Sequence, residues 1–96
     1  MNNIIFNRIR NLLWIYWKNF LPLDTDLNQP VKEIFFGWDT VDFLRLINKY
    51  NEDFSLHLPE SFEKANAMET ISDIIIFVGE YSHGEEKKMD AETELG

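Results

Sequence analysis

The chain has 96 residues, a length that fits one compact domain with a single hydrophobic core. Its 45% hydrophobic and 15% aromatic content excludes global disorder, because large apolar side chains offset the entropy lost when the backbone is ordered. The sequence has no cysteine, which excludes disulfides and thiolate metal sites and makes a reducing cytoplasm the expected location. A net charge of -8 argues against a nucleic-acid partner, since such binding depends on neutralising phosphates with Lys and Arg.

Charge is distributed unevenly along the chain. Residues 1–20 contain Arg8, Arg10 and Lys18 and no acidic residue, whereas the remainder is strongly acidic. An acidic body would suit a partner with a basic surface, or would serve only to keep the protein soluble. The longest apolar run near the N-terminus covers only residues 12–17, so neither a signal peptide nor a membrane span is expected.

Residues 3–19 show the period of an amphipathic helix. Trp17 lies at the edge of its apolar face, and Trp14 falls among polar residues. We expect a folded-over loop to cover Trp14, with an exposed contact surface as the alternative. The predicted core face consists of Ile5, Ile9, Leu12, Leu13, Tyr16 and Phe20.

Residues 21–36 are rich in turn-forming residues and show no sustained period, so we expect a long loop pinned by apolar side chains. The run Asp24-x-Asp26-x-Asn28 matches the start of a calcium loop, but the glycine and the bidentate Glu that such a loop needs are missing. A capped, solvated turn is therefore expected here, without a metal.

Residues 38–51 predict a second long helix, whose core face consists of Phe43, Leu46, Ile47 and Tyr50. On the opposite face, Trp38, Val41 and Arg45 have the spacing of one stripe directed away from the core. Asp39 and Asp42 lie in the first turn, where the helix dipole favours anions. The alternative for Trp38 is that it packs under the preceding loop.

Two further helices follow. Pro59 is expected to open a short helix over residues 60–64, because the first helical position needs no N–H. A last helix over residues 69–79 is expected to begin at a cap from Asn66 or Thr70 and to end at Gly79. Its predicted core face consists of Met68, Ile71, Ile74, Ile75 and Val78. Residues 1–79 thus form the predicted helical domain, and residues 80–96 an acidic, disordered tail.

Patterns that carry catalysis or metal binding are not found in the sequence. His57 and His83 have no helix-spaced partners that could share a metal ion. The four glycines form no phosphate-cradling motif, and no serine has the context of a nucleophile elbow. We therefore expect no enzymatic activity, no metal and no cofactor.

The order of these elements, together with three short motifs, resembles the acyl carrier protein family over roughly residues 4–79. The loop sequence LDTDL at residues 23–27 is similar to the family's T-x-x-T-x-L, and WDTVD at residues 38–42 is similar to L-D-T-V-E. Leu58-Pro59-Glu60 is similar to the family's I-P-D. The resemblance implies an all-α four-helix bundle with a long loop between the first and second helices and a short third helix.

The main departure from the family lies at the D-S-L motif, whose Ser carries the phosphopantetheine arm. Aligning Trp38 with the Leu of this motif puts Gly37 at the Ser position. Glycine has no hydroxyl, so the phosphodiester to phosphopantetheine cannot form there. The chain in this respect resembles a small bacterial group of acyl-carrier-like proteins of unknown function with Gly near this point.

These observations predict a non-catalytic, acyl-carrier-like interaction module without a phosphopantetheine arm. It would bind an unidentified protein, one with a basic surface, through Trp38, Asp39, Val41, Asp42 and Arg45 of the second long helix.

Two alternatives remain open. The chain could be a genuine carrier that is modified at another hydroxyl, for instance Thr40 or Ser61. It could also be a peripheral membrane protein whose first helix uses Trp14, Ile15 and Trp17, with Arg10 and Lys18 at the lipid headgroups. Membrane binding is not expected, because the domain needs the apolar face of that helix to close a bundle.

Overall fold

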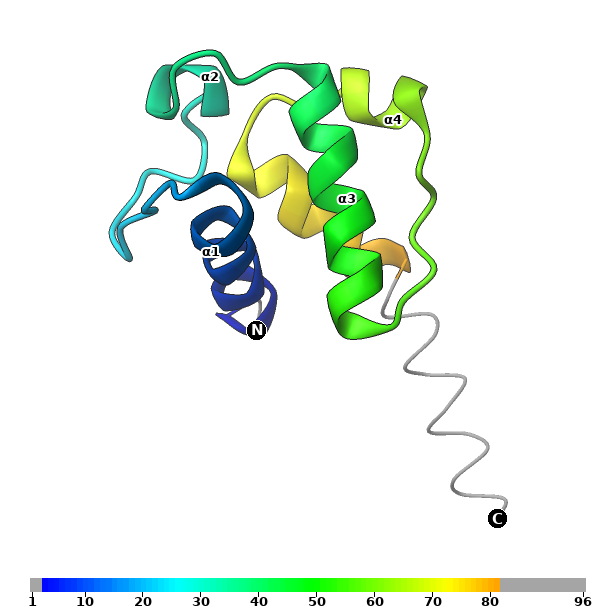
Figure 1. The fold of residues 1–96 in the computed structure, drawn as a ribbon. Helices are drawn as coiled ribbons and strands as arrows, with labels where there is room; N and C mark the ends of the chain where they lie inside the picture. Colours follow the sequence, from blue (N-terminus) through cyan, green and yellow to red (C-terminus); the bar gives the residue numbers. More distant parts are fainter. Residues whose placement is uncertain (1–2, 82–96) are drawn as a thin grey trace.

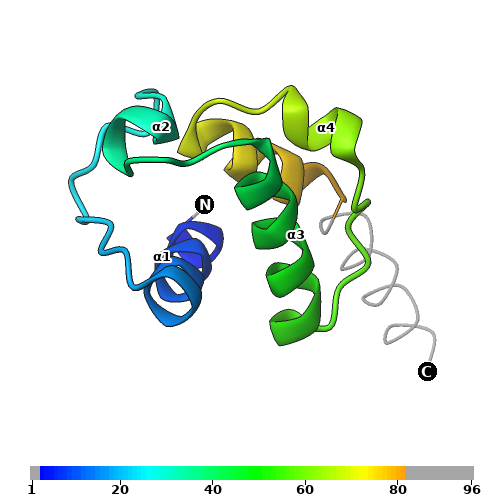
Figure 2. The ribbon, with the colours of Figure 1, turned by 45° about the horizontal axis from the view of Figure 1, so that its top comes forward.

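The computed structural model describes residues 3–81, which fold into helices joined by turns, with no strand in that range. The helices are α1 (Asn3–Trp17), α2 (Val31–Ile34), α3 (Thr40–Phe54) and α4 (Phe62–Asn66), followed by a last helix over residues 71–81. Figures 1 and 2 show α1 and α3 in front of the last helix, with α4 beside the N-terminal end of α3. The predicted all-α class is confirmed.

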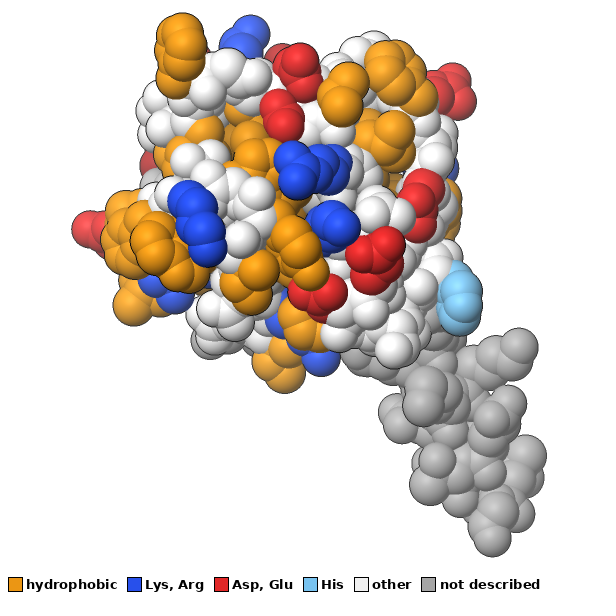
Figure 3. Space-filling model, viewed as in Figure 1, with side chains coloured by type: hydrophobic (Ala, Val, Ile, Leu, Met, Phe, Trp, Pro, Cys, Tyr) orange, Lys and Arg blue, Asp and Glu red, His pale blue; other side chains and the backbone are white. Residues whose placement is uncertain are grey.

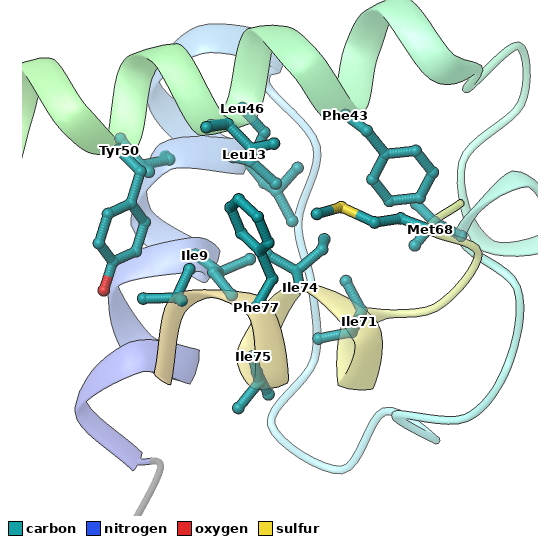
Figure 4. Packing of buried hydrophobic residues seen from close by; sticks show 14 of the residues in the cluster. Ile9, Leu13, Phe43, Leu46, Tyr50, Met68, Ile71, Ile74, Ile75 and Phe77 are labelled. Atoms are coloured by element: carbon teal, nitrogen blue, oxygen red, sulfur yellow. The ribbon is translucent and has the colours of Figure 1, made fainter. Parts of the chain in front are cut away.

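One hydrophobic core joins the long helices, and Figure 4 shows side chains from α1, α3 and the last helix converging on it. The predicted faces of α3 and the last helix are buried at every position, because side chains that recur every 3.6 residues share one side of a helix. The α1 side of the core consists of Ile9, Leu12 and Leu13, with Ile5 and Tyr16 packed at its edge.

The end of α1 corrects the prediction for Phe20. The helix ends at Trp17, and Lys18 adopts a left-handed backbone conformation with φ 58°. The amides of Lys18 and Asn19 donate back to the carbonyls of Trp14 (3.0 Å) and Leu13 (3.1 Å). Because the chain leaves the helix direction there, Phe20 is 64% exposed and does not join the core.

The connection from residue 18 to residue 30 is attached to the start of the last helix. Ser72 N–H donates to the Leu27 carbonyl at 2.9 Å, and Val31 N–H donates to the Glu69 carbonyl at 2.8 Å. The Asp26 carboxylate accepts from Asn28 N–H at 2.9 Å, as in the capped turn that the sequence predicts. The single turn of α2 was not predicted and interrupts the expected loop.

A reciprocal cap starts the last helix. Thr70 Oγ1 accepts from Asp73 N–H, and the Asp73 carboxylate accepts from Thr70 N–H, both at 3.0 Å, so Thr70 is the cap of the two predicted. The predicted end at Gly79 is wrong, because residues 80 and 81 are also helical. A methyl group at Gly79 would lie 3.9 Å from Ile5 Cδ1, an ordinary contact. The rest of the predicted tail lies outside the described residues.

The predicted position of the short helix is also shifted. Pro59 precedes α4 and does not open it; Ser61 is the N-cap, and its hydroxyl accepts from Lys64 N–H at 3.3 Å. An extended segment of residues 56–60 separates this cap from the end of α3.

A buried amide holds that extended segment against α3. Asn51 donates to the Leu58 carbonyl at 2.9 Å and accepts from Leu58 N–H at 2.8 Å, so it pairs both backbone groups of one residue. The amides of Asn51 and Asn48 also donate to Glu60 and hold the pKa of that carboxyl below its ordinary value. A lowered folded pKa stabilises the fold above the unfolded-state pKa, and this contribution is lost as the pH falls through the folded value.

We predict that Asn51→Ala lowers the free energy of unfolding by about 2–4 kcal/mol, because both backbone groups of Leu58 lose their buried partner. Asn48→Ala removes an exposed hydrogen bond to the same Glu60 and is the matched control, with an expected loss of about 0.5 kcal/mol. Urea denaturation of both variants measures the difference, and equal losses would contradict the proposed clamp.

Candidate functional site

The candidate site is the N-terminal part of α3, where the sequence predicts the partner-binding stripe. Asp39 is the N-cap of the helix, and its carboxylate accepts from Asp42 N–H at 3.3 Å. The Asp42 carboxylate accepts in return from Asp39 N–H at 3.1 Å and from Trp17 Nε1–H at 3.2 Å. Asp42 thus ties the start of α3 to the end of α1, while Asp39 stays exposed.

Trp38 is a correction to the predicted stripe. Its side chain is only 6% exposed. Trp38 precedes the N-cap, so its side chain points into the core, whereas a helical wheel would direct it outward. Its ring centroid lies 5.2 Å from that of Trp17, 6.1 Å from that of Phe35 and 5.6 Å from that of Phe43, the last in a T-shaped arrangement. The alternative that Trp38 packs inside, under the preceding segment, is therefore the correct one.

The backbone conformation of the turn before α3 favours glycine at position 37. Trp38 N–H donates to the Phe35 carbonyl at 3.2 Å, which closes a four-residue turn, and Gly37 at its third position has φ +82°. A type II turn needs a positive φ at this position, where glycine carries no steric penalty. Apart from its two chain neighbours, no residue has an atom within 4 Å of where a Cβ would be, so a serine here would meet backbone strain and no clash.

The remaining stripe residues lie on the surface. Val41 is 61% exposed, and Arg45 is exposed with its guanidinium carbon 4.9 Å from the ring centroid of Trp17. Figure 3 shows hydrophobic, acidic and basic side chains interleaved over this face of the molecule. Phe36, which the prediction omitted, is fully exposed at the preceding turn. The sequence signal for this exposure is Gly37, because the tight turn that buries Trp38 directs Phe36, at its second position, outward.

A shallow hollow of about 200 Å³ lies beside the start of α3. Trp38, Phe43 and Met68 form its apolar part, and Thr40 and Asn66 lie on its polar side. Thr40 Oγ1 donates to Asn66 Oδ1 at 3.0 Å, which joins α3 to the end of α4. Trp38 Nε1 is buried without a hydrogen-bond partner among residues 3–81. The indole N–H thus loses its hydrogen bond to water on folding and forms none within the protein in return.

The hydroxyls considered for carrier modification both serve local structure. Thr40 is half-buried and bonds to Asn66, and the Ser61 hydroxyl caps α4. Between residues 3 and 81, no three His, Asp or Glu side chains are grouped so that they could share a metal ion. His83 lies outside the described residues. No helix in the same range is long and apolar enough to cross a membrane.

Comparisons with known proteins found no match. No protein-family model, no curated protein and no solved structure matches this chain.

We predict that Trp38→Ala lowers the free energy of unfolding by about 3–5 kcal/mol, as expected when a large buried ring is removed. Trp38→Phe keeps most of the ring packing and also removes the unpaired N–H, so its loss should be clearly smaller. Thermal and urea unfolding of the two variants test this. If Trp38→Ala left the melting temperature unchanged, Trp38 would be the surface residue that the sequence pattern predicts.

Proposed function

We propose that this protein is a non-catalytic interaction module that binds a partner protein through the outer face of α3. The proposal rests on the exposure of Val41 within a face that also presents Asp39, Asp42 and Arg45. An isolated exposed valine needs no explanation, but here it stands between charged groups of both signs on a helix whose other face is fully used by the core.

The order of the helices supports an acyl-carrier-like bundle as the framework of this module. A long helix, a long connection, a second long helix, a short helix and a last helix follow one another as the resemblance implies. α3 packs against both α1 and α4, which is how the second long helix of such a bundle would be held. The turn of α2 is a local addition within the long connection.

Preorganisation favours α3 as the binding element. The capping box fixes its first turn, and the Trp17 indole fixes the carboxylate of Asp42. Arg45 is held over the Trp17 ring. Side chains ordered before association lose less entropy when a partner binds.

The charge of the face indicates the chemistry of the partner. Asp39 is exposed two residues before Val41, and the chain as a whole carries a net charge of -8. A protein with basic side chains around an apolar residue would be attracted at a distance and would bury Val41 on contact. Phe36, exposed at the same end of α3, extends the apolar part of this surface.

We predict that Val41→Lys lowers partner capture at least about tenfold, since it replaces the apolar centre with a charge that repels a basic partner. Ile76→Lys is the matched control: Ile76 is 56% exposed on the last helix, so the substitution changes the net charge equally at another surface. Both variants should keep the wild-type melting temperature, because both sites face solvent.

The measurement is quantitative affinity capture from the native host with wild type and the two variants side by side. A partner that Val41→Lys loses and Ile76→Lys retains supports the proposal. Equal capture by all three proteins would contradict it.

A second prediction separates this function from a carrier modified at another hydroxyl. Incubation with a phosphopantetheinyl transferase and coenzyme A should add no mass to the protein, because Gly37 has no hydroxyl and Thr40 and Ser61 are engaged in local hydrogen bonds. Intact-mass spectrometry measures this directly, with a known carrier protein as the positive control. A stoichiometric adduct would overturn the proposal.

A further inference from the structure

A second surface, at the C-terminal end of α1, combines exposed apolar side chains with cations. We call it the α1-end patch and define it by Arg10, Trp14, Ile15, Lys18 and Phe20. Trp14 is 54% exposed and Phe20 is 64% exposed, and more than half of Ile15 is also accessible. The expectation that a loop covers Trp14 is therefore wrong.

Structure on both sides of Phe20 holds it outward. Before it, the left-handed Lys18 ends α1 and turns the chain. After it, Leu21 is buried, and Arg10 Nε donates to the Leu21 carbonyl at 2.6 Å. Phe20 thus stands between two anchored points, so its exposure follows from the path of the backbone.

The cations of the patch lie against its aromatic rings. The Arg10 guanidinium carbon is 5.6 Å from the Phe20 ring centroid, and Lys18 Nζ is 5.8 Å from the Trp14 ring centroid. Arg10, Trp14 and Phe20 also line one hollow of about 280 Å³. Long cationic side chains beside aromatic rings bring charge and apolar surface to the same level, as at a membrane interface.

Acidic residues are absent from this stretch of the sequence: none occurs before Asp24. The α3 face, in contrast, presents acidic and basic groups together. A protein partner normally offers both charges and directional hydrogen bonds, whereas an anionic lipid surface requires only cations and bulky apolar groups. The composition of the α1-end patch fits the lipid surface better.

We propose that the α1-end patch binds the surface of an anionic phospholipid bilayer. Trp14, Ile15 and Phe20 enter the boundary between headgroups and acyl chains, and Arg10 and Lys18 meet the lipid phosphates. In this binding mode the patch lies on the membrane surface. The acidic remainder of the protein repels the same surface, and this repulsion decays over about 8 Å at physiological salt. The attraction of Arg10 and Lys18 to the anionic lipids is screened over the same distance, so binding is reversible and falls as salt rises.

Vesicle co-sedimentation of the full-length protein tests the proposal. The probes are vesicles of phosphatidylcholine alone and of phosphatidylcholine with about one third phosphatidylserine, a composition whose surface potential attracts cations. We expect binding to the anionic vesicles at low salt, several-fold weaker binding at high salt, and little binding to the neutral vesicles.

Matched variants locate the surface. Lys18→Glu should lower the partition coefficient about tenfold or more, whereas Lys64→Glu makes the same charge change on α4 and should have little effect. Phe20→Ala should lower binding several-fold, with Phe62→Ala, at a similarly exposed position of α4, as its control. Figures 1 and 2 show α4 on the other side of α3 from α1.

Tryptophan fluorescence provides a readout that electrostatic adsorption alone would not change. Brominated lipids should quench the emission of the bound protein, and Trp14→Phe should remove most of that quenching, since Trp17 and Trp38 are packed against each other. Three results would overturn the proposal: no binding to anionic vesicles at low salt, equal effects of the patch and α4 variants, or quenching that survives Trp14→Phe.

Discussion

The burial of Trp38 is the constraint on which the candidate site of this molecule depends. Its ring packs against Trp17 at the end of α1, Phe35 of the preceding turn and Phe43 of α3. To bring the ring inward, the chain closes a turn immediately before it, and this turn requires the left-handed conformation of Gly37. Gly37 and the outward position of Phe36 thus both follow from the burial of Trp38. The loss of a serine is not needed to explain the glycine.

Trp17 connects the buried Trp38 to the outer face of α3. Its indole contacts Trp38 on the inside, donates to Asp42 and supports the guanidinium of Arg45. The end of α1 and the outer face of α3 are therefore parts of one connected arrangement. The two surfaces still differ in chemistry, because the α3 face carries charges of both signs and the α1-end patch carries cations alone. We propose a protein partner for the first and an anionic lipid surface for the second.

Helical periodicity predicted the interior of this protein well and its helix ends poorly. The apolar faces of α3 and the last helix are buried as expected, and Val41, Asp39 and Arg45 are exposed as expected. Phe20 and Trp38 were both misplaced for one physical reason: each lies just outside a helix, where successive side chains no longer advance by 100°. The fold class was therefore predictable, whereas the key residue of the candidate site was not.

By itself the sequence determined the helical class, the buried faces, the acidic balance of the chain and its cationic start, because these depend on periodicity and composition. Only the tertiary structure decided that Trp38 belongs to the core, that Phe20 and Trp14 face solvent and that Asn51 pairs both backbone groups of Leu58. Each of these depends on where the chain turns after a helix ends. That direction is set by packing between segments far apart in the sequence, which no local pattern records.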